Sequence, residues 1–216
     1  MTTLETIHLT CPNCAFEFDS SRADTRESHG RKHTDFQPPS DGASALQHGV
    51  HLCKSCGFAG PEQWFANSDG ISYDVQRHVW DELTPRVSGQ LPTSERYEFA
   101  ARVAIWDGAD ARNIADLWLR AAWCCVDERD TEAERFYRRH AARSFEECLD
   151  AYDGVPRDER ATLAYLVGEL WRRIGDQARA KEWFERVANE VVDPYRQAWL
   201  LRLTKQQHHD PREWFA

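Results

Sequence analysis

The sequence predicts a mostly α-helical α+β fold with a small β-rich domain over residues 1–60 and a helical domain over residues 61–216. Two cysteine pairs, Cys11 with Cys14 and Cys53 with Cys56, have the spacing of metal knuckles and mark the first part. Helical periodicity with capping residues marks the second, and one helix pair has the residue pattern of a tetratricopeptide repeat. The predicted architecture is a small β-rich zinc ribbon packed on a short tetratricopeptide-like α-helical solenoid.

The two Cys-x-x-Cys motifs supply four thiolates in one short segment, which is the ligand set of a closed structural Zn²⁺ site. Each motif is followed by a small residue, Ala15 or Gly57. A small residue is needed there because the backbone of a tight knuckle turns its N–H groups toward the sulfur atoms. We therefore expect one structural Zn²⁺ ion, with no position open for catalysis, bound by Cys11, Cys14, Cys53 and Cys56.

Short strands are expected to lead into the knuckles, over residues 5–10 and 49–52. Thirty-eight residues separate Cys14 from Cys53, so the ribbon carries an inserted hairpin or arm, expected beside the metal. Within the insertion, residues 31–36 are either a recognition arm for a partner or nucleotide, or a structural tie. We favour the tie, with Asp35 bonding an arginine or a backbone turn and Phe36 in the small core.

From Pro61 the pattern becomes helical. Asp110 is a suitable cap, Thr131 with Glu134 forms a capping box, and Asp193-Pro194 is expected to start the last helix. The expected helices cover residues 61–65, 73–83, 93–106, 110–126, 131–151, 160–174 and 177–191, with a last one from 193.

The pair over 160–174 and 177–191 carries the repeat pattern. Its small residues let the two helices approach closely, and its aromatic residues fill the next layer. The preceding pair, over 117–148, matches less well, so the expected solenoid is short and is capped by the ribbon and the last helix. The residues of the pattern are Val167, Gly168, Trp171, Gly175, Ala180 and Phe184.

Charge and composition disfavour some functions. The 216-residue chain has a formal net charge of −9, and residues 1–60 hold five Lys and Arg against seven Asp and Glu, whereas nucleic-acid-binding domains usually carry a basic patch. No run of about 18 apolar residues predicts a membrane span, and the N-terminus lacks the pattern of a secretory signal. With seven cysteines, an odd number, in metal-type spacing, these features favour the reducing cytoplasm.

An ordered set of motifs extends over roughly residues 5–125. It consists of Cys11-Pro12-Asn13-Cys14 with Phe16 and Phe18, then Arg31 and His33-Thr34-Asp35-Phe36, then Cys53-Lys54-Ser55-Cys56-Gly57-Phe58-Ala59 with Phe65, and Leu119-Arg120-Ala121-Ala122-Trp123. This set resembles the bacterial domain-of-unknown-function 2225 family. The resemblance implies a cytosolic protein with a zinc-ribbon-like N-terminus, a tetratricopeptide-like remainder and no established activity. Ala15 stands where that family usually has glycine, and Gln37 where many relatives have another cysteine.

Other reactive residues have simpler interpretations. Histidines of the ribbon leave a second metal site open, although their spacing fits no standard motif and hydrogen-bonded surface side chains are the alternative. The remaining cysteines are expected to be buried core thiols, and the tryptophans of the helices to serve packing. These residues are His29, His33, His48 and His51, then Cys124, Cys125 and Cys148, then Trp106, Trp118, Trp123, Trp171, Trp183 and Trp199.

We expect no enzymatic activity, because no phosphate loop, nucleophile elbow or metalloprotease motif is present. The leading hypothesis is a non-enzymatic zinc-binding adaptor that binds a partner protein or peptide through its helical-repeat surface, in a groove formed with the ribbon. The acidic helical face favours a basic partner, and exposed aromatic residues leave homo-oligomerisation open. The alternatives are a metal-dependent enzyme and a nucleic-acid-associated regulator that uses a stripe of Arg22, Arg26, Arg31, Lys32 and Lys54.

Overall fold

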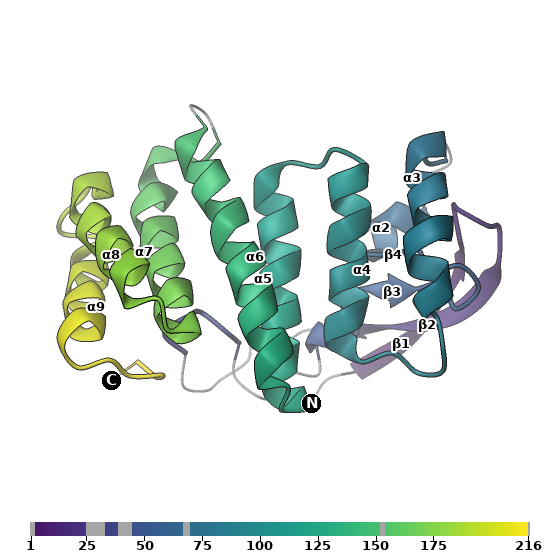
Figure 1. The fold of residues 1–216 in the computed structure, drawn as a ribbon, viewed down its shortest axis with the longest axis horizontal. Coiled ribbons are helices and arrows are strands. Elements are labelled where there is room, and N and C mark those ends of the chain that lie inside the picture. The colour runs from purple at the N-terminus through teal and green to yellow at the C-terminus, as the bar shows by residue number, and fades with distance from the viewer. Residues whose placement is uncertain (1–2, 25–32, 39–44, 67–69, 152–153, 216) are drawn as a thin grey trace.

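The computed structural model describes residues 3–24, 33–38, 45–66, 70–151 and 154–215. The helices stand side by side in one row, and from α4 onward each packs on the next helix of the chain (Figure 1). Strands β1 to β4 lie at the α4 end of this row, and the C-terminus lies at the opposite end. The prediction of a mostly helical fold with a small β-rich N-terminal part is confirmed.

Two short hairpins make up the ribbon. Strands β1 (Thr3–Thr10) and β2 (Glu17–Asp24) pair antiparallel along their whole length. Strands β3 (His51–Leu52) and β4 (Ala59–Gly60) form a separate antiparallel pair. One cysteine motif forms the turn of each hairpin, so the strands expected before each knuckle are confirmed and each gains a partner strand after it.

Short helical turns connect the ribbon to the row. Helix α2 (Glu62–Phe65) is followed by α3 (Tyr73–His78), which continues as a π-helical turn, η1 (Val79–Leu83), and a 3₁₀ turn, η2 (Thr84–Arg86). The Ser72 hydroxyl caps α3 by accepting from the Val75 N–H. The expected helix over 73–83 is confirmed, with its last turn widened to a π-helix.

Aspartate side chains start three of the long helices. Asp110, Asp130 and Asp176 each accept a hydrogen bond from the backbone N–H three residues later, which satisfies one of the free donors of a helix start. The helices of the row are α4 (Thr93–Trp106), α5 (Ala111–Glu128), α6 (Thr131–Asp150), α7 (Arg157–Ile174), α8 (Gln177–Glu190) and α9 (Ala198–His209).

One predicted capping residue and the predicted start of the last helix are wrong. The cap of α6 is Asp130 rather than Thr131, because the carboxylate one residue earlier reaches the Ala133 N–H at 3.0 Å. The last helix does not begin at Asp193-Pro194. There the Asp193 carboxylate accepts from two successive backbone N–H groups in a turn, and α9 begins only at Ala198.

Helices α7 and α8 approach closely at Gly168. A Cβ added at this position would lie 2.6 Å from Cδ1 of Phe184, so the Phe184 ring occupies the space that any side chain would need. The tryptophans of the row mainly serve packing, as predicted. Trp118, Trp123 and Trp171 are buried, whereas Trp199 is 39% exposed.

The arm over residues 33–38 lies against the distal part of the row and not beside the metal centre. Asp35 accepts a hydrogen bond from Arg138 of α6 at 2.6 Å, and both side chains are fully buried. Phe36 packs against Tyr165 of α7 and Trp199 of α9. The tie of Asp35 to an arginine is confirmed. The expected position beside the metal and the placement of Phe36 in the small core are wrong, because the buried cation and the rings that the arm contacts belong to the row.

Gly168→Val is expected to lower the free energy of unfolding by about 1–3 kcal/mol, because the new side chain overlaps the Phe184 ring. Urea or thermal unfolding measures the loss. The double variant Gly168→Val/Phe184→Leu should regain part of it, since leucine leaves more room. Ala178→Val, at an exposed position of α8, is the control and should cost less than about 1 kcal/mol. Equal losses in the two single variants would contradict the close approach.

Candidate metal centre

The four predicted cysteines come together between the two hairpins. Their Sγ atoms all lie within 4.8 Å of one another. Two of the separations are 3.6 Å, between Cys11 and Cys56 and between Cys14 and Cys53. Each short contact joins one motif to the other, and all seven cysteines of the chain are free thiols. The motifs therefore meet as two halves of one site.

The arrangement fits a tetrahedral metal ion. An ion with metal–sulfur bonds of about 2.3 Å holds its four sulfur ligands about 3.8 Å apart. The observed Sγ separations of 3.6 Å to 4.8 Å bracket this value. Four protein ligands complete a tetrahedron, so a metal ion held here has no position for substrate or water.

Both motifs fold into the same backbone turn. In each, the first cysteine N–H donates to the carbonyl five residues later, and the residue after the second cysteine donates back to the first cysteine, with N···O distances of 2.9 Å in all four bonds. The residue after the second cysteine is left-handed in both turns, with φ of 57° at Ala15 and 85° at Gly57. The chain thus places an alanine where glycine is the residue best suited to the backbone.

The turns of η1 and η2 cover the second knuckle. A Cβ added at Gly57 would lie 3.0 Å from Cβ of Leu83 and 3.0 Å from Cγ2 of Val87. The Thr84 hydroxyl donates to the Cys56 carbonyl at 2.7 Å. The metal centre is therefore attached to the start of the helical part by close packing and by a hydrogen bond to a ligand residue.

Burial and proximity set the ionisation of the thiols. Cys11, Cys53 and Cys56 are buried, and Cys14 is half-buried. Hydrogen bonds with Cys53 and Cys56, and then burial, raise the pKa of Cys11 far above its usual value. Four thiolates this close together repel one another, and a bound divalent cation offsets that repulsion.

The histidines of the ribbon have hydroxyl partners. Nδ1 of His51 lies 2.8 Å from the Ser20 Oγ, and Nδ1 of His48 lies 2.7 Å from the Ser21 Oγ. Burial lowers the pKa of His51, which favours its neutral form. These contacts support the interpretation of both rings as hydrogen-bonded side chains.

No second metal cluster occurs in the part of the chain that the structure describes, where the four cysteines form the one candidate set of three or more His, Cys, Asp or Glu. His33 lies in the arm with its ring against that of Trp214, at a centroid separation of 3.6 Å and an interplanar angle of 37°. His29 falls outside the described residues.

The remaining thiols belong to the helical core. Cys124 and Cys125 on α5 and Cys148 on α6 are buried. Burial raises the pKa of all three, to about 12 for Cys125 and about 11 for Cys148. A raised pKa keeps a thiol protonated and unreactive, in agreement with the prediction of core packing.

A groove lies at the junction of ribbon and row, and the sequence did not predict which residues line it. This cavity of about 720 Å³ is bordered by residues 18–21 of β2, by residues 47–54 around β3 and by residues 87–96 at the start of α4. Lys54 and Arg96 contribute positive charge to it. Sequence reasoning expected a groove between the two parts, but three segments distant in the sequence form it, and no local pattern identifies them.

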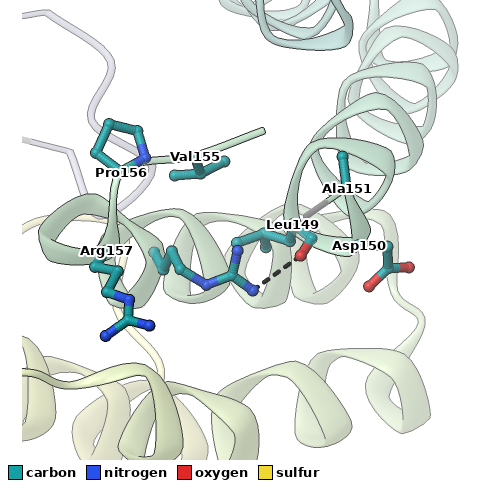
Figure 2. A pocket seen from close by; sticks show the side chains of 7 residues that line it. Leu149, Asp150, Ala151, Val155, Pro156 and Arg157 are labelled. Carbon is teal, nitrogen blue, oxygen red and sulfur yellow. Dashed lines mark hydrogen bonds between the residues drawn. The ribbon is translucent and has the colours of Figure 1, made fainter. Parts of the chain in front are cut away.

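A second cavity, of about 550 Å³, lies between the end of α6 and the start of α7. Figure 2 shows Leu149 and Asp150 on one side of it and Arg157 on the other. Its other arginine, Arg160, is already engaged, because it donates to the Leu149 carbonyl at 2.8 Å and pairs with Glu190 at 2.7 Å. This cavity therefore presents no free set of ligand-binding groups.

Cys53→Ser is expected to abolish metal binding, because a serine hydroxyl does not replace a thiolate and the site holds the hairpins together. Elemental analysis of the purified protein should fall from about one metal ion per chain to below about 0.2. Limited proteolysis should then cleave within residues 1–60 first. Cys148→Ser removes a thiol from α6 and is the control. Full metal content in Cys53→Ser would refute the site.

The two left-handed positions should respond in opposite directions. Ala15→Gly removes the strain of a left-handed alanine and is expected to stabilise the knuckle by up to about 1 kcal/mol. Gly57→Ala creates that strain and also crowds Leu83, so it should destabilise the knuckle by about 1–3 kcal/mol. The rate at which a chelator removes the metal measures both effects. A slower release of the metal from Gly57→Ala than from wild type would contradict the expected strain at residue 57.

Comparison with known proteins identifies the family of the chain. A family model described as "Uncharacterized protein conserved in bacteria (DUF2225)" matches residues 4–210. No curated protein and no solved structure matches the chain. Since the matched range runs from the first strand to the end of α9, the chain belongs to this family of uncharacterized bacterial proteins.

Proposed function

We propose that this protein is a non-enzymatic zinc-binding adaptor that binds a partner protein through the groove between its ribbon and its helical row. The observation that carries the proposal is the groove itself, about 720 Å³ in volume and formed jointly by both parts. A cavity of this size accommodates a short segment of a partner chain. The metal centre supports one wall of the groove, and α4 supports the other.

Zinc is the metal that this ligand set favours. Four soft thiolates in a tetrahedral arrangement select zinc over the oxygen-binding cations calcium and magnesium. A closed site of this kind contributes folding energy and leaves no open position for chemistry. We therefore assign the ion a structural role, which is to fix the two hairpins and the edge of the groove.

The charges of the groove indicate the chemistry of its partner. Lys54 is exposed at its border, and Arg96 is half-buried there with its Nε donating to the Leu91 carbonyl. The one acidic residue of the lining, Asp19, is paired with His8 at 2.8 Å. A chain that is acidic overall thus offers cations at this place, which favours an acidic segment of the partner rather than the basic one expected from the net charge.

The helical row supports the comparison with tetratricopeptide repeats. Small and large residues of α7 and α8 interlock at Gly168 and Phe184, as the repeat pattern requires. Helices α5 and α6 form a preceding antiparallel pair of similar length. We propose that this short stack gives the ribbon a rigid base and makes the protein suited to binding.

A nucleic-acid-associated regulator is the second candidate, because Lys54 and Arg96 also suit phosphate groups. Of the predicted cationic stripe, Arg22 is already bonded to Glu5 and Glu62, and the three members between 26 and 32 lie outside the described residues. A metal-dependent enzyme has less support, since a Cys₄ site is closed. In the described residues no helix is long and apolar enough to span a membrane, and a cytoplasmic location stays a prediction.

Charge reversal in the groove tests the proposal. The variant Lys54→Glu/Arg96→Glu should capture at least about tenfold less of the partner protein from an extract of the host than the wild-type chain does. Arg202→Glu/Lys205→Glu, with the same charge change on exposed residues of α9, is the matched control and should retain the partner. Quantitative mass spectrometry of the captured proteins gives the comparison, with metal content confirming that each variant is folded.

Two outcomes would contradict the proposal. If both double variants capture the same proteins equally, the groove is not the binding surface. If the captured material is lost on nuclease treatment and the groove variant alone loses retention on heparin, the nucleic-acid alternative holds instead.

A further inference from the structure

The arm lies in the helical row in the way that a bound peptide lies in a receptor. Residues 33–37 contact α6, α7, α9 and the chain after α9, all of them distant in the sequence. The hydroxyl of Tyr165 donates to the Thr34 carbonyl at 3.0 Å, and the Thr34 N–H donates to the Glu213 carbonyl at 2.9 Å. Both contacts are made to the backbone of the arm, which turns at residues 33–36 through a hydrogen bond from the Phe36 N–H to the His33 carbonyl at 3.0 Å.

Besides Thr34, whose hydroxyl donates to the buried Glu169 at 2.7 Å, two further side chains of the arm give this contact its specificity. The Asp35 carboxylate is fully buried, 2.6 Å from Nη1 of Arg138 and 3.6 Å from Nη2 of Arg173. The next residue, Phe36, has its ring among three aromatic rings, with centroid separations of 5.7 Å to Tyr165, 6.5 Å to Trp199 and 6.2 Å to Phe215. The site thus binds a carboxylate followed at once by an aromatic ring.

The fit of the arm is imperfect. Nη2 of Arg138 is buried without a hydrogen-bond partner, and so are Nδ1 of His33 and Oε1 of Gln37. Phe36 is also held in the left-handed region, at φ of 63°, which a bulky residue rarely adopts. Unpartnered buried groups and backbone strain both weaken the docking of a segment. These four features involve residues 33–37 of the arm and Arg138, to which the arm is bound. Another segment can therefore bind the same site with less strain.

We propose that the face formed by α6, α7 and α9 is a recognition site for a peptide segment that carries an acidic residue followed by an aromatic one, and that residues 33–37 occupy it as an exchangeable internal competitor. The occupant in trans is a segment of a partner protein with this chemistry, whose carboxylate also engages the free Nη2 of Arg138. This site is separate from the groove at the ribbon junction, and each can fail its test without affecting the other.

Peptide binding to the full chain tests the site directly. The probe is a fluorescent peptide with the sequence of residues 33–38, His-Thr-Asp-Phe-Gln-Pro, measured by anisotropy against wild type and Asp35→Ala/Phe36→Ala. The variant should bind the probe at least about tenfold more tightly, because an internal competitor reduces the apparent affinity by the fraction of open sites. A probe with lysine in place of its aspartate should bind at least about tenfold more weakly.

A third variant distinguishes binding at this site from non-specific binding of the probe. Adding Arg138→Met to the opened variant should remove binding of the probe, because methionine keeps much of the side-chain volume and lacks the cation. Equal binding of the two probes, or no binding by an opened variant that retains its metal and helical content, overturns the proposal.

Hydrogen exchange of the wild-type protein gives a measurement that needs no variant. If the arm leaves and re-enters its site, the backbone amides of residues 33–37 should exchange with solvent at least about tenfold faster than those of α6 and α7, which open with the global transition. Excess unlabelled probe should leave the exchange of α6 and α7 unchanged and speed that of the arm. If the amides of the arm exchange with solvent only at the rate of those in α6 and α7, the arm is a permanent structural element and the proposal is overturned.

Discussion

The ribbon is organised around four closely spaced cysteines, three of them buried and one half-buried, that can hold one metal ion. Without a cation, the sulfur atoms of Cys11, Cys14, Cys53 and Cys56, all within 4.8 Å of one another, cannot all be ionised, and two hairpins of two strands each have little apolar core of their own. With a cation, both hairpins are fixed at their turns, and the bond from Thr84 to the Cys56 carbonyl connects this point to the helical part. With a metal ion bound, the groove wall formed by β2 and β3 would be held by metal–sulfur bonds in addition to the packing of Phe18 and Phe58 on Phe65.

The opposite end of the molecule is organised by buried charge. Glu169 of α7 is fully buried and accepts from Thr34 of the arm at 2.7 Å, from Arg172 at 2.7 Å and from Arg173 at 2.9 Å. Such a network is stable only while each charge keeps its partners, because a single unpaired ion in the interior is costly. Ribbon and row are thus joined twice, by apolar packing near the metal and by polar contacts through the arm.

Sequence reasoning predicted what short-range patterns determine. Cysteine spacing identified the four cysteines that come together, and hydrophobic periodicity placed each long helix of the row, with α4 correct at both ends. It failed at helix starts where two capping residues compete, as at Asp130 and Thr131, since both have the right side chain and only the backbone angles decide. It also failed for the arm: nothing near Phe36 indicates that its partners, Tyr165 and Trp199, lie more than a hundred residues away.

The two proposed binding surfaces share one physical property, which is positive charge in an acidic chain. At the ribbon groove Lys54 is exposed and Arg96 is half-buried, whereas Arg138 is fully buried under the arm. Water reaches and screens the two groove cations, so they contribute mainly to the rate and selectivity of encounter. The buried arginine is screened far less, and a carboxylate that reaches it gains a strong contact only by displacing the one already there. A partner with one acidic segment would therefore bind quickly at the groove and slowly at the arm site. Its occupancy of the arm site would depend on how readily Asp35 leaves Arg138.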